Sequence, residues 1–324
     1  MNSEASAEPA AAPARPHPAR LTVGVVGVGR VGAALGAALS RAGHQVVAVS
    51  GVSEASLRRA EASLPGVPLT EPHEVVARAE LVLLTVPDDA LPGLAAGLAA
   101  TGAELTGRLL VHTSGRYGTD VLEPAVRRGA LPLALHPVMT FTGRSDDVDR
   151  LDGISFGVTA PDPLRPAAEA LVIEMGGEPV FIREADRGLY HAALASAANH
   201  LVGLVAEASD LLHAAGVANP ARMLGPLLSA ALDNALRLGD AGLSGPVARG
   251  DAGTVARHIE VLGGASVPAQ QAYLALARLT VGRALAAGLL SAADARSVLA
   301  VLERPQAGGE AGSAGSAGSG GPAA

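Results

Sequence analysis

A glycine-rich segment carries the clearest chemical signal in this chain. It follows an apolar run at 21–26 and opens a helix-forming stretch at 31–42. Its six residues are Gly27, Val28, Gly29, Arg30, Val31 and Gly32. In such a segment the first glycine permits a tight turn, the second lets the backbone approach a diphosphate, and the third allows the helix to pack closely on the strand. The free N–H groups of the helix attract phosphate. We therefore predict a dinucleotide site; the alternative is a glycine-rich turn that has lost its ligand.

The residues after the second apolar run indicate which dinucleotide. NAD sites of this type place an acid about 20 residues downstream, where it accepts from the ribose 2′-hydroxyl. Here the run ends in Ser50, and no carboxylate occurs before Glu54. Ser50 and Ser53 can donate to a 2′-phosphate, and Arg58 or Arg59 can pair with it. We predict NADP rather than NAD, unless the two arginines are only solvated helix residues.

Three further apolar runs end in residues that can line the same site. Ligands of open α/β sheets bind at the carboxyl ends of strands. We expect Val86 and Pro87 to contact the nicotinamide ribose, and Thr113 and Ser114 to contact the cofactor. His136 ends the third run and is a candidate proton donor, although a backbone carbonyl can equally satisfy it.

A long helix predicted at 185–215 carries polar residues among alanines. Ser196, Asn199 and Gly203 share one face at helical spacing. His191 can serve as a general acid, because a histidine titrates near neutrality. This polar face fits a helix that lines a cleft, and it also fits a helix packed against a neighbour with its polar atoms satisfied locally.

A loop near residue 250 adds candidates for substrate binding. Arg249 can bind a carboxylate with two hydrogen bonds. Asp251 is a second candidate, or the N-cap of a helix that includes Thr254 and His258. We predict no metal site, because the histidines lack ligand spacing and the chain has no cysteine.

The elements that must position these residues fall into two groups. Near-continuous apolar runs alternate with helical stretches over 21–185, which predicts an α/β Rossmann-like domain with a mainly parallel sheet. Residues 186–304 contain only helical patterns and predict an all-α domain. A Pro/Ala-rich leader at 1–20 and a Gly/Ser/Ala tail at 305–324 are expected to be disordered. The apolar runs of the first domain lie at 21–27, 44–50, 81–87, 108–114, 131–137, 154–160 and 178–183.

Composition excludes several kinds of partner and chemistry. The net charge is −7 and no basic run occurs, which argues against nucleic acid and anionic membranes. We find no uninterrupted apolar stretch of transmembrane length and no signal-peptide pattern, so we expect a cytoplasmic protein. All 24 basic residues are arginine, so neither a Schiff base nor a lysine ammonium can take part in catalysis.

Several motifs together resemble the 6-phosphogluconate dehydrogenase-like superfamily, which includes ketopantoate, pyrroline-carboxylate and β-hydroxyacid reductases. The chain resembles more closely a bacterial family with a Rossmann-like domain and a helical domain of unknown function. The resemblance covers about residues 21–303. Its motifs are GVGRVG (27–32), LLTVPDDAL (83–91), VHTSG (111–115), LHPVMTF (135–141) and SGPVARGD (244–251), the last followed by Thr254 and His258.

The resemblance implies a small-molecule substrate, a nicotinamide bound between the two domains, and a homodimer formed through the helical domain. β-Hydroxyacid and ketopantoate reductases use a lysine near the start of the interdomain helix and an asparagine further along it. Here His191 lies near the expected place of the lysine, and Asn199 near that of the asparagine. We expect these two and His136 to be the catalytic residues, with Ser196, Arg249 and Asp251 binding substrate.

These inferences favour an NADP-dependent oxidoreductase acting on a small keto, hydroxy or imino compound. Two alternatives remain open. The missing lysine favours a protein that binds the nucleotide as a sensor without hydride chemistry. A reduced deazaflavin can also replace the nicotinamide, as it does in some members of the superfamily.

Overall fold

The computed structural model describes residues 20–304, so the predicted leader and tail lie outside the described residues except for Arg20. The chain divides into two compact units, 1–197 and 198–324. The predicted boundary near 185 marks where strands give way to helices, whereas the units divide further along, inside the long helix.

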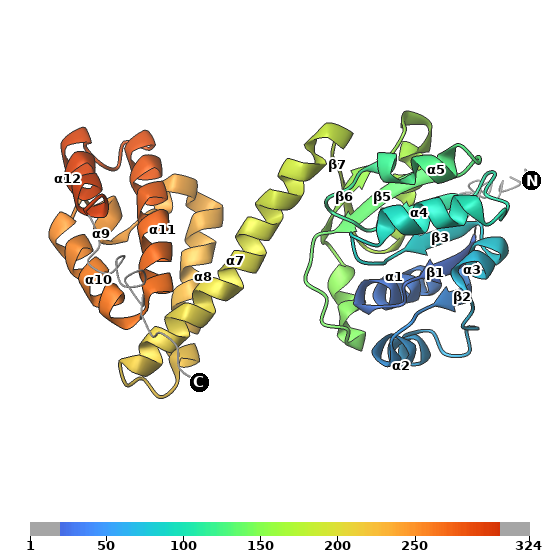
Figure 1. Ribbon diagram of the computed structural model, residues 1–324, viewed down its shortest axis with the longest axis horizontal. Helices are drawn as coiled ribbons and strands as arrows, with labels where there is room; N and C mark the ends of the chain where they lie inside the picture. Colours follow the sequence, from blue (N-terminus) through green and yellow to red (C-terminus); the bar gives the residue numbers. More distant parts are fainter. Residues whose placement is uncertain (1–19, 305–324) are drawn as a thin grey trace, which may run out of the picture. The chain divides into compact units, whose positions relative to one another are not determined.

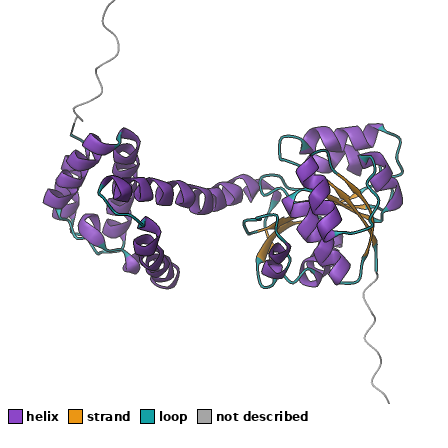
Figure 2. Ribbon diagram, turned by 90° about the horizontal axis from the view of Figure 1, so that it is seen from below, coloured by secondary structure: helices purple, strands orange, loops and turns teal. Residues whose placement is uncertain are grey.

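The N-terminal unit is built on a seven-stranded sheet in the order β2-β1-β3-β4-β5-β6-β7. Helices cover both faces of this sheet (Figures 1 and 2). The fold is the Rossmann-like α/β domain that the sequence predicts. The strands are β1 (Thr22–Val26), β2 (Gln45–Ser50), β3 (Leu81–Leu84), β4 (Leu109–His112), β5 (Leu131–Pro137), β6 (Ser155–Thr159) and β7 (Glu178–Phe181).

The two faces of the sheet carry separate apolar cores, made mostly of valine, leucine and alanine. Phe156 on β6 is the one fully buried aromatic side chain among the described residues. All four residues of β3 are buried, as expected for a strand covered on both faces. The covering helices are α1 (Arg30–Arg41), α2 (Glu54–Ser63), α3 (Pro72–Arg78), α4 (Leu91–Ala100), α5 (Glu123–Val126) and α6 (Arg165–Glu174).

One strand runs against the others. β1 to β5 pair in parallel, but β6 is antiparallel to β5, and β7 is parallel to β6. The prediction of a mainly parallel sheet is confirmed. The reversal could not be predicted, because a short apolar run looks alike in both directions. It sets Gly157 of β6 opposite His136 of β5.

The C-terminal unit is entirely helical in its described part, as predicted. Its core includes Val255, Ile259, Val281 and Val298. Ser291 caps the last helix by accepting from the Asp294 amide, as expected. The helices are α7 (Arg187–Ala214, shared with the first unit), α8 (Pro220–Leu238), α9 (Gly245–Ala248), α10 (Ala252–Ala265), α11 (Val267–Ala286) and α12 (Ala292–Leu302). The one-turn helix α9 was not predicted, since four residues show no helical period.

The helical segment Glu184–Ala214 meets the length and composition of a membrane span, with a mean hydropathy of 1.2. Inspection of the sequence found no such stretch, because polar residues interrupt it. One such helix is weak evidence for a membrane. Both parts of the helix make polar contacts within folded units, through Arg187 in the first and Glu207 in the second.

Candidate functional site

The glycine loop connects β1 to α1, and its three glycines have different surroundings. Gly27 has φ +93°, and an added Cβ would lie 2.8 Å from the carbonyl oxygen of Thr85. A Cβ at Gly32 would lie 2.5 Å from the Gly27 oxygen and would also meet the Thr85 hydroxyl. A Cβ at Gly29, in contrast, would meet nothing nearer than 3.9 Å. The protein's own packing requires the first and third glycines, whereas the second borders open space.

Hydrogen bonds hold this loop and leave the N-terminus of α1 free. The amides of Gly27 and Val28 both donate to the Ser50 carbonyl at 2.9 Å, and the Thr85 hydroxyl donates to the Gly27 carbonyl at 2.7 Å. No side chain caps α1 and no acid lies in its first turn. The unpaired N–H groups of that turn, beside the open space at Gly29, fit a diphosphate.

The residues predicted to recognise a 2′-phosphate are placed unequally. Ser50 is buried and contributes its carbonyl to the loop, so its hydroxyl is not exposed to a ribose. Ser53 is exposed and caps α2, where its Oγ accepts from the Ser56 amide at 3.1 Å. Arg58 pairs with Glu54 at 3.2 Å on the exposed side of α2.

Two other arginines lie together near the loop. A Cβ added at Gly143 would lie 2.8 Å from both Arg30 Cγ and Arg59 Nε. Arg30 also donates to the Phe141 carbonyl at 3.4 Å. Neither guanidinium forms an ion pair within residues 20–304. The buried carboxylate of Asp147 shapes this segment by accepting from the Gly143 amide at 2.7 Å.

The predicted residues at the strand ends surround the same loop. Val86 contacts it, since its Cγ1 would lie 3.0 Å from a Cβ at Gly27, and Pro87 follows as an exposed residue. Thr113 is half-buried at the end of β4. The hydroxyl of the buried Ser114 accepts from the amides of Arg116 and Tyr117, each at 3.2 Å, so this side chain shapes a turn.

A buried arginine joins the strand ends to α7. Arg187 is 1% exposed, yet it has no carboxylate partner among the described residues. Its Nη2 donates to the carbonyls of Ala134 (3.1 Å) and Gly157 (3.0 Å). Its Nη1 donates to the Ser114 carbonyl (3.3 Å), and its Nε to the Thr159 hydroxyl (2.8 Å). Four hydrogen bonds thus fix the start of the helix against β4, β5 and β6.

One turn along α7, aromatic side chains gather around His136. The Tyr190 hydroxyl lies 2.8 Å from His136 Nδ1. The ring of His191 stands edge-on to His136, with centroids 6.1 Å apart. A Cβ at Gly115 would lie 3.0 Å from His136 Nε2 and 2.8 Å from His191 Cδ2. The structure therefore brings two of the predicted catalytic residues together.

Sequence reasoning missed Tyr190 and Arg187. The only available signal was the spacing Arg187, Tyr190, His191 in the first turn of a helix, where residues three apart share a face. The partners of both side chains lie on strands far away in the sequence.

Burial sets the protonation of these groups. It lowers the pKa of His136 to about 4, helped by the positive charges of Arg187 and His191. Burial also lowers the pKa of His112 to about 4, although the Gly118 carbonyl, 2.7 Å from its Nε2, opposes this. The pKa of Tyr190 is raised by burial. At neutral pH both imidazoles are uncharged and the phenol keeps its proton.

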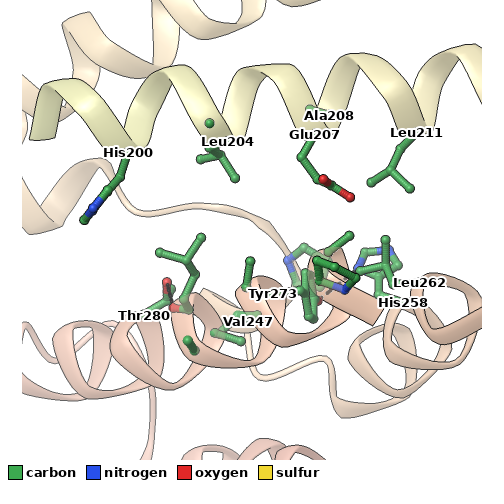
Figure 3. Close-up of a pocket in the computed structure, with 18 of the residues that line it drawn as sticks. His200, Leu204, Glu207, Ala208, Leu211, Val247, His258, Leu262, Tyr273 and Thr280 are labelled. Carbon is green, nitrogen blue, oxygen red and sulfur yellow. Dashed lines mark hydrogen bonds between the residues drawn. The ribbon is translucent and has the colours of Figure 1, made fainter. Parts of the chain in front are cut away.

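The C-terminal unit contains a mostly apolar pocket of about 830 Å³, which Asn199 of α7 helps to line. Figure 3 shows side chains of α7, including Leu204 and Glu207, across from those of α10 and α11. His258 Nδ1 and the Tyr273 hydroxyl lie 3.0 Å apart in it.

The remaining predicted substrate residues lie on exposed surface. Ser196 belongs to the part of α7 in the first unit, and Arg249 follows α9. Asp251 caps α10, accepting from the Thr254 amide at 3.0 Å and its hydroxyl at 2.7 Å, which is the structural alternative weighed for it. Across residues 20–304, no group of three or more acidic or histidine side chains could hold a metal ion.

Family comparisons agree with this two-part organisation. Residues 7–137 match the model of a Rossmann-like domain, which is the class that the sheet and glycine loop define. Residues 154–280 match a domain of unknown function, DUF2520. The chain is thus a Rossmann-like protein with a DUF2520 domain.

Relatives and solved structures place it among wider groups. It is 32% identical over 170 residues to a glycerol-3-phosphate dehydrogenase [NAD(P)+] of Bradyrhizobium sp. strain ORS 278, covering 48% of this chain and 50% of the relative. The chain thus spans about half the length of the curated relatives it matches. Similar folds occur in protein TM1727 of Thermotoga maritima (TM-score 0.62, 20% identity, covering 82% and 100% of the two chains) and an imine reductase of Pseudomonas sp. (TM-score 0.59, 20% identity, 87% and 100%).

The neutral histidines predict acid sensitivity of the N-terminal unit. A histidine in an unfolded chain has a pKa of about 6.5, whereas His112 and His136 titrate at about 4 when folded. The unfolded chain therefore binds more protons between these values, and stability falls as the pH drops through this window. We expect the thermal midpoint to decline from pH 7 to 5, and to decline less in His136→Gln. His73→Gln, at an exposed position on α3, should keep the wild-type slope; equal slopes in all three would contradict this assignment.

Proposed function

We propose that this protein is a cytoplasmic, NADP-dependent oxidoreductase that acts on a small keto, hydroxy or imino compound. The open space at Gly29 carries the proposal. No protein atom requires a glycine there, and the free end of α1 lies beside it, so a ligand accounts for this residue. The relatives named as NAD(P)+ dehydrogenase and imine reductase support the reaction class.

The residues around this space have distinct roles in the proposal. A bound NADPH would place its diphosphate at Gly29 and the N-terminus of α1, and it would supply a hydride. The chain's own contribution is the cluster of His136 and His191 at the carboxyl edge of β4 and β5. Asn199 and Arg249 remain candidates for orienting the substrate.

The first test is cofactor binding and turnover. Gly29→Asp places a carboxylate against the diphosphate, and like charges in contact cost several kcal/mol. We expect NADPH affinity, measured by titration calorimetry, to fall at least about 100-fold. Gly97→Asp on α4, where a Cβ also meets nothing, should bind as wild type does.

Oxidation of NADPH with a panel of 2-keto acids, aldehydes and cyclic imines tests the reaction. Binding without turnover of any member would favour the nucleotide sensor. A deazaflavin would be recognised by its absorbance in the purified protein, and its presence would overturn the choice of NADP.

The preference for NADP over NAD is a separate part of the proposal. The exposed Ser53 and the first turn of α2 offer hydrogen bonds to a 2′-phosphate, and Arg30 and Arg59 offer charge. Arg58 is a weaker candidate than the sequence suggested, because Glu54 already neutralises it. No carboxylate between Ser50 and Ser53 competes for the ribose.

Arg59→Ala tests this preference. A hydrogen bond to a charged group contributes about 1.5–3 kcal/mol, so NADPH affinity should fall about 10- to 100-fold while NADH affinity stays unchanged. Arg58→Ala removes a neighbouring arginine of the same helix and should change neither. Equal losses for both cofactors, or wild-type NADH binding as tight as NADPH binding, would contradict the preference for NADP.

We also propose that the C-terminal unit forms a homodimer. Monomeric proteins rarely expose large apolar patches. On α8, five large apolar side chains are more than half exposed in the single chain: Met223 58%, Leu227 64%, Leu232 54%, Leu236 78% and Leu238 56%. A second copy of the same helical unit is the occupant we propose for this surface, in agreement with the family resemblance.

Light scattering during size-exclusion chromatography tests the dimer. The wild-type protein should have twice the chain mass, and the double variant Leu232→Asp, Leu236→Asp should be monomeric because two charges cannot be buried unpaired. Ile173→Asp, at a 58% exposed position of α6 in the other unit, should remain dimeric. A monomeric wild-type protein would refute the proposal.

A further inference from the structure

The pair formed by His136 and Tyr190 has a defined direction of hydrogen bonding. The phenol oxygen lies 2.8 Å from His136 Nδ1, and the two rings stand edge-on at 89°. A side chain at position 157 would collide with the phenol, so Gly157 on β6 makes room for it. The Gly157 amide donates a hydrogen bond to the phenol oxygen.

The phenol proton has one acceptor among the described residues, namely His136 Nδ1. If Nδ1 carried the ring proton, the half-buried hydroxyl would have no acceptor, which is unfavourable. Donation from Tyr190 to Nδ1 removes this conflict. The single proton of the neutral imidazole then lies on Nε2.

The Nε2 edge of His136 has no protein acceptor within residues 20–304. Gly115 faces this edge, because a Cβ there would lie 3.0 Å from Nε2. The missing side chain leaves space between the His136 and His191 rings. An N–H group without an acceptor, pointing toward space at the carboxyl edge of the sheet, is suited to bind a substrate atom.

We propose that Tyr190 holds His136 with its ring proton on Nε2, so that the uncharged imidazole donates a hydrogen bond to the carbonyl oxygen of the substrate. This rests on the proposed function and specifies its substrate class. A carbonyl oxygen has lone pairs that accept such a bond, whereas an iminium nitrogen has none. Ketones and aldehydes are therefore the expected substrates, with His136 as the catalytic residue and Tyr190 as a positioning residue.

The protons balance in the direction of reduction. The carbonyl carbon gains a hydride, and the reduced nicotinamide that supplies it becomes oxidised. The oxygen takes the Nε2 proton as the C=O double bond becomes a single bond. Nδ1 then takes the phenol proton, and the phenolate, which lies near the Arg187 guanidinium, regains a proton from water.

The charged and titratable groups around His136 give this arrangement a distinct pH profile. Arg187, Tyr190 and His191 face it from α7, and His112 faces it from β4. The opposing residue on β6, Gly157, does not titrate. With a neutral donor, kcat/KM should be flat from about pH 5 to 8, whereas an imidazolium acid would lose activity above about 6.5.

Long-range ¹H–¹⁵N NMR of the histidine rings in the full chain tests the proton position without turnover. We expect Nε2–H for His136 in the wild type and a mixture of tautomers in Tyr190→Phe. Tyr273→Phe removes the corresponding hydroxyl beside His258 and is the matched control: it should alter the His258 signals and leave those of His136 unchanged.

Kinetics with the best carbonyl substrate provide the second readout. Tyr190→Phe should lower kcat about tenfold, the effect of one neutral hydrogen bond, and His136→Phe about 100-fold or more. Tyr273→Phe should keep wild-type rates. Turnover with a proton on Nδ1, or with a pH profile unchanged in Tyr190→Phe, would overturn this inference alone. The predicted tautomer without NADPH oxidation by any carbonyl compound would overturn the proposed function and the catalytic role with it.

Discussion

The guanidinium of Arg187 lies where β4, β5 and β6 meet the start of α7, and the other features of the candidate site depend on it. Removing a cation from water is costly unless hydrogen bonds replace the lost hydration. Three backbone carbonyls and one hydroxyl provide that replacement. A lysine could not do the same, since one ammonium has three donors at a single point whereas the guanidinium spreads five over a plane.

This cation also fixes the chemical state of its neighbours. Its charge adds to burial in keeping His112 and His136 neutral, and it favours the anionic form of Tyr190. A carboxylate partner would have cancelled both effects. The absence of such a partner thus makes the site a place where uncharged donors and acceptors act beside one permanent positive charge.

Sequence reasoning succeeded where function depends on neighbouring residues. The spacing of Gly27, Gly29 and Gly32 predicted a loop that the structure contains, and strand ends correctly marked one edge of the sheet. It failed where contacts come from distant strands: no local pattern shows that Gly157 faces His136, or that Tyr190 fills the space this glycine leaves.

Competition between partners explains the weaker predictions. Ser50 and Arg58 have the chemistry to bind phosphate, but the structure uses the carbonyl of the first and pairs the second with Glu54. The Glu54–Arg58 pair has the i, i+4 spacing of a helical ion pair and could have been foreseen. The proximity of Arg30 and Arg59 to Gly143 could not, because that segment lies more than eighty residues further along the chain.

The hydrogen bonds of Arg187 have an evolutionary consequence. A backbone carbonyl is present whatever the side chain, so the residue at position 134 can change without removing the acceptor that this cation needs. Gly157 is an exception, because the phenol of Tyr190 occupies its side-chain space. Descendants of this protein could therefore alter the lining of the site, and the molecules it accepts, while inheriting the same electric field.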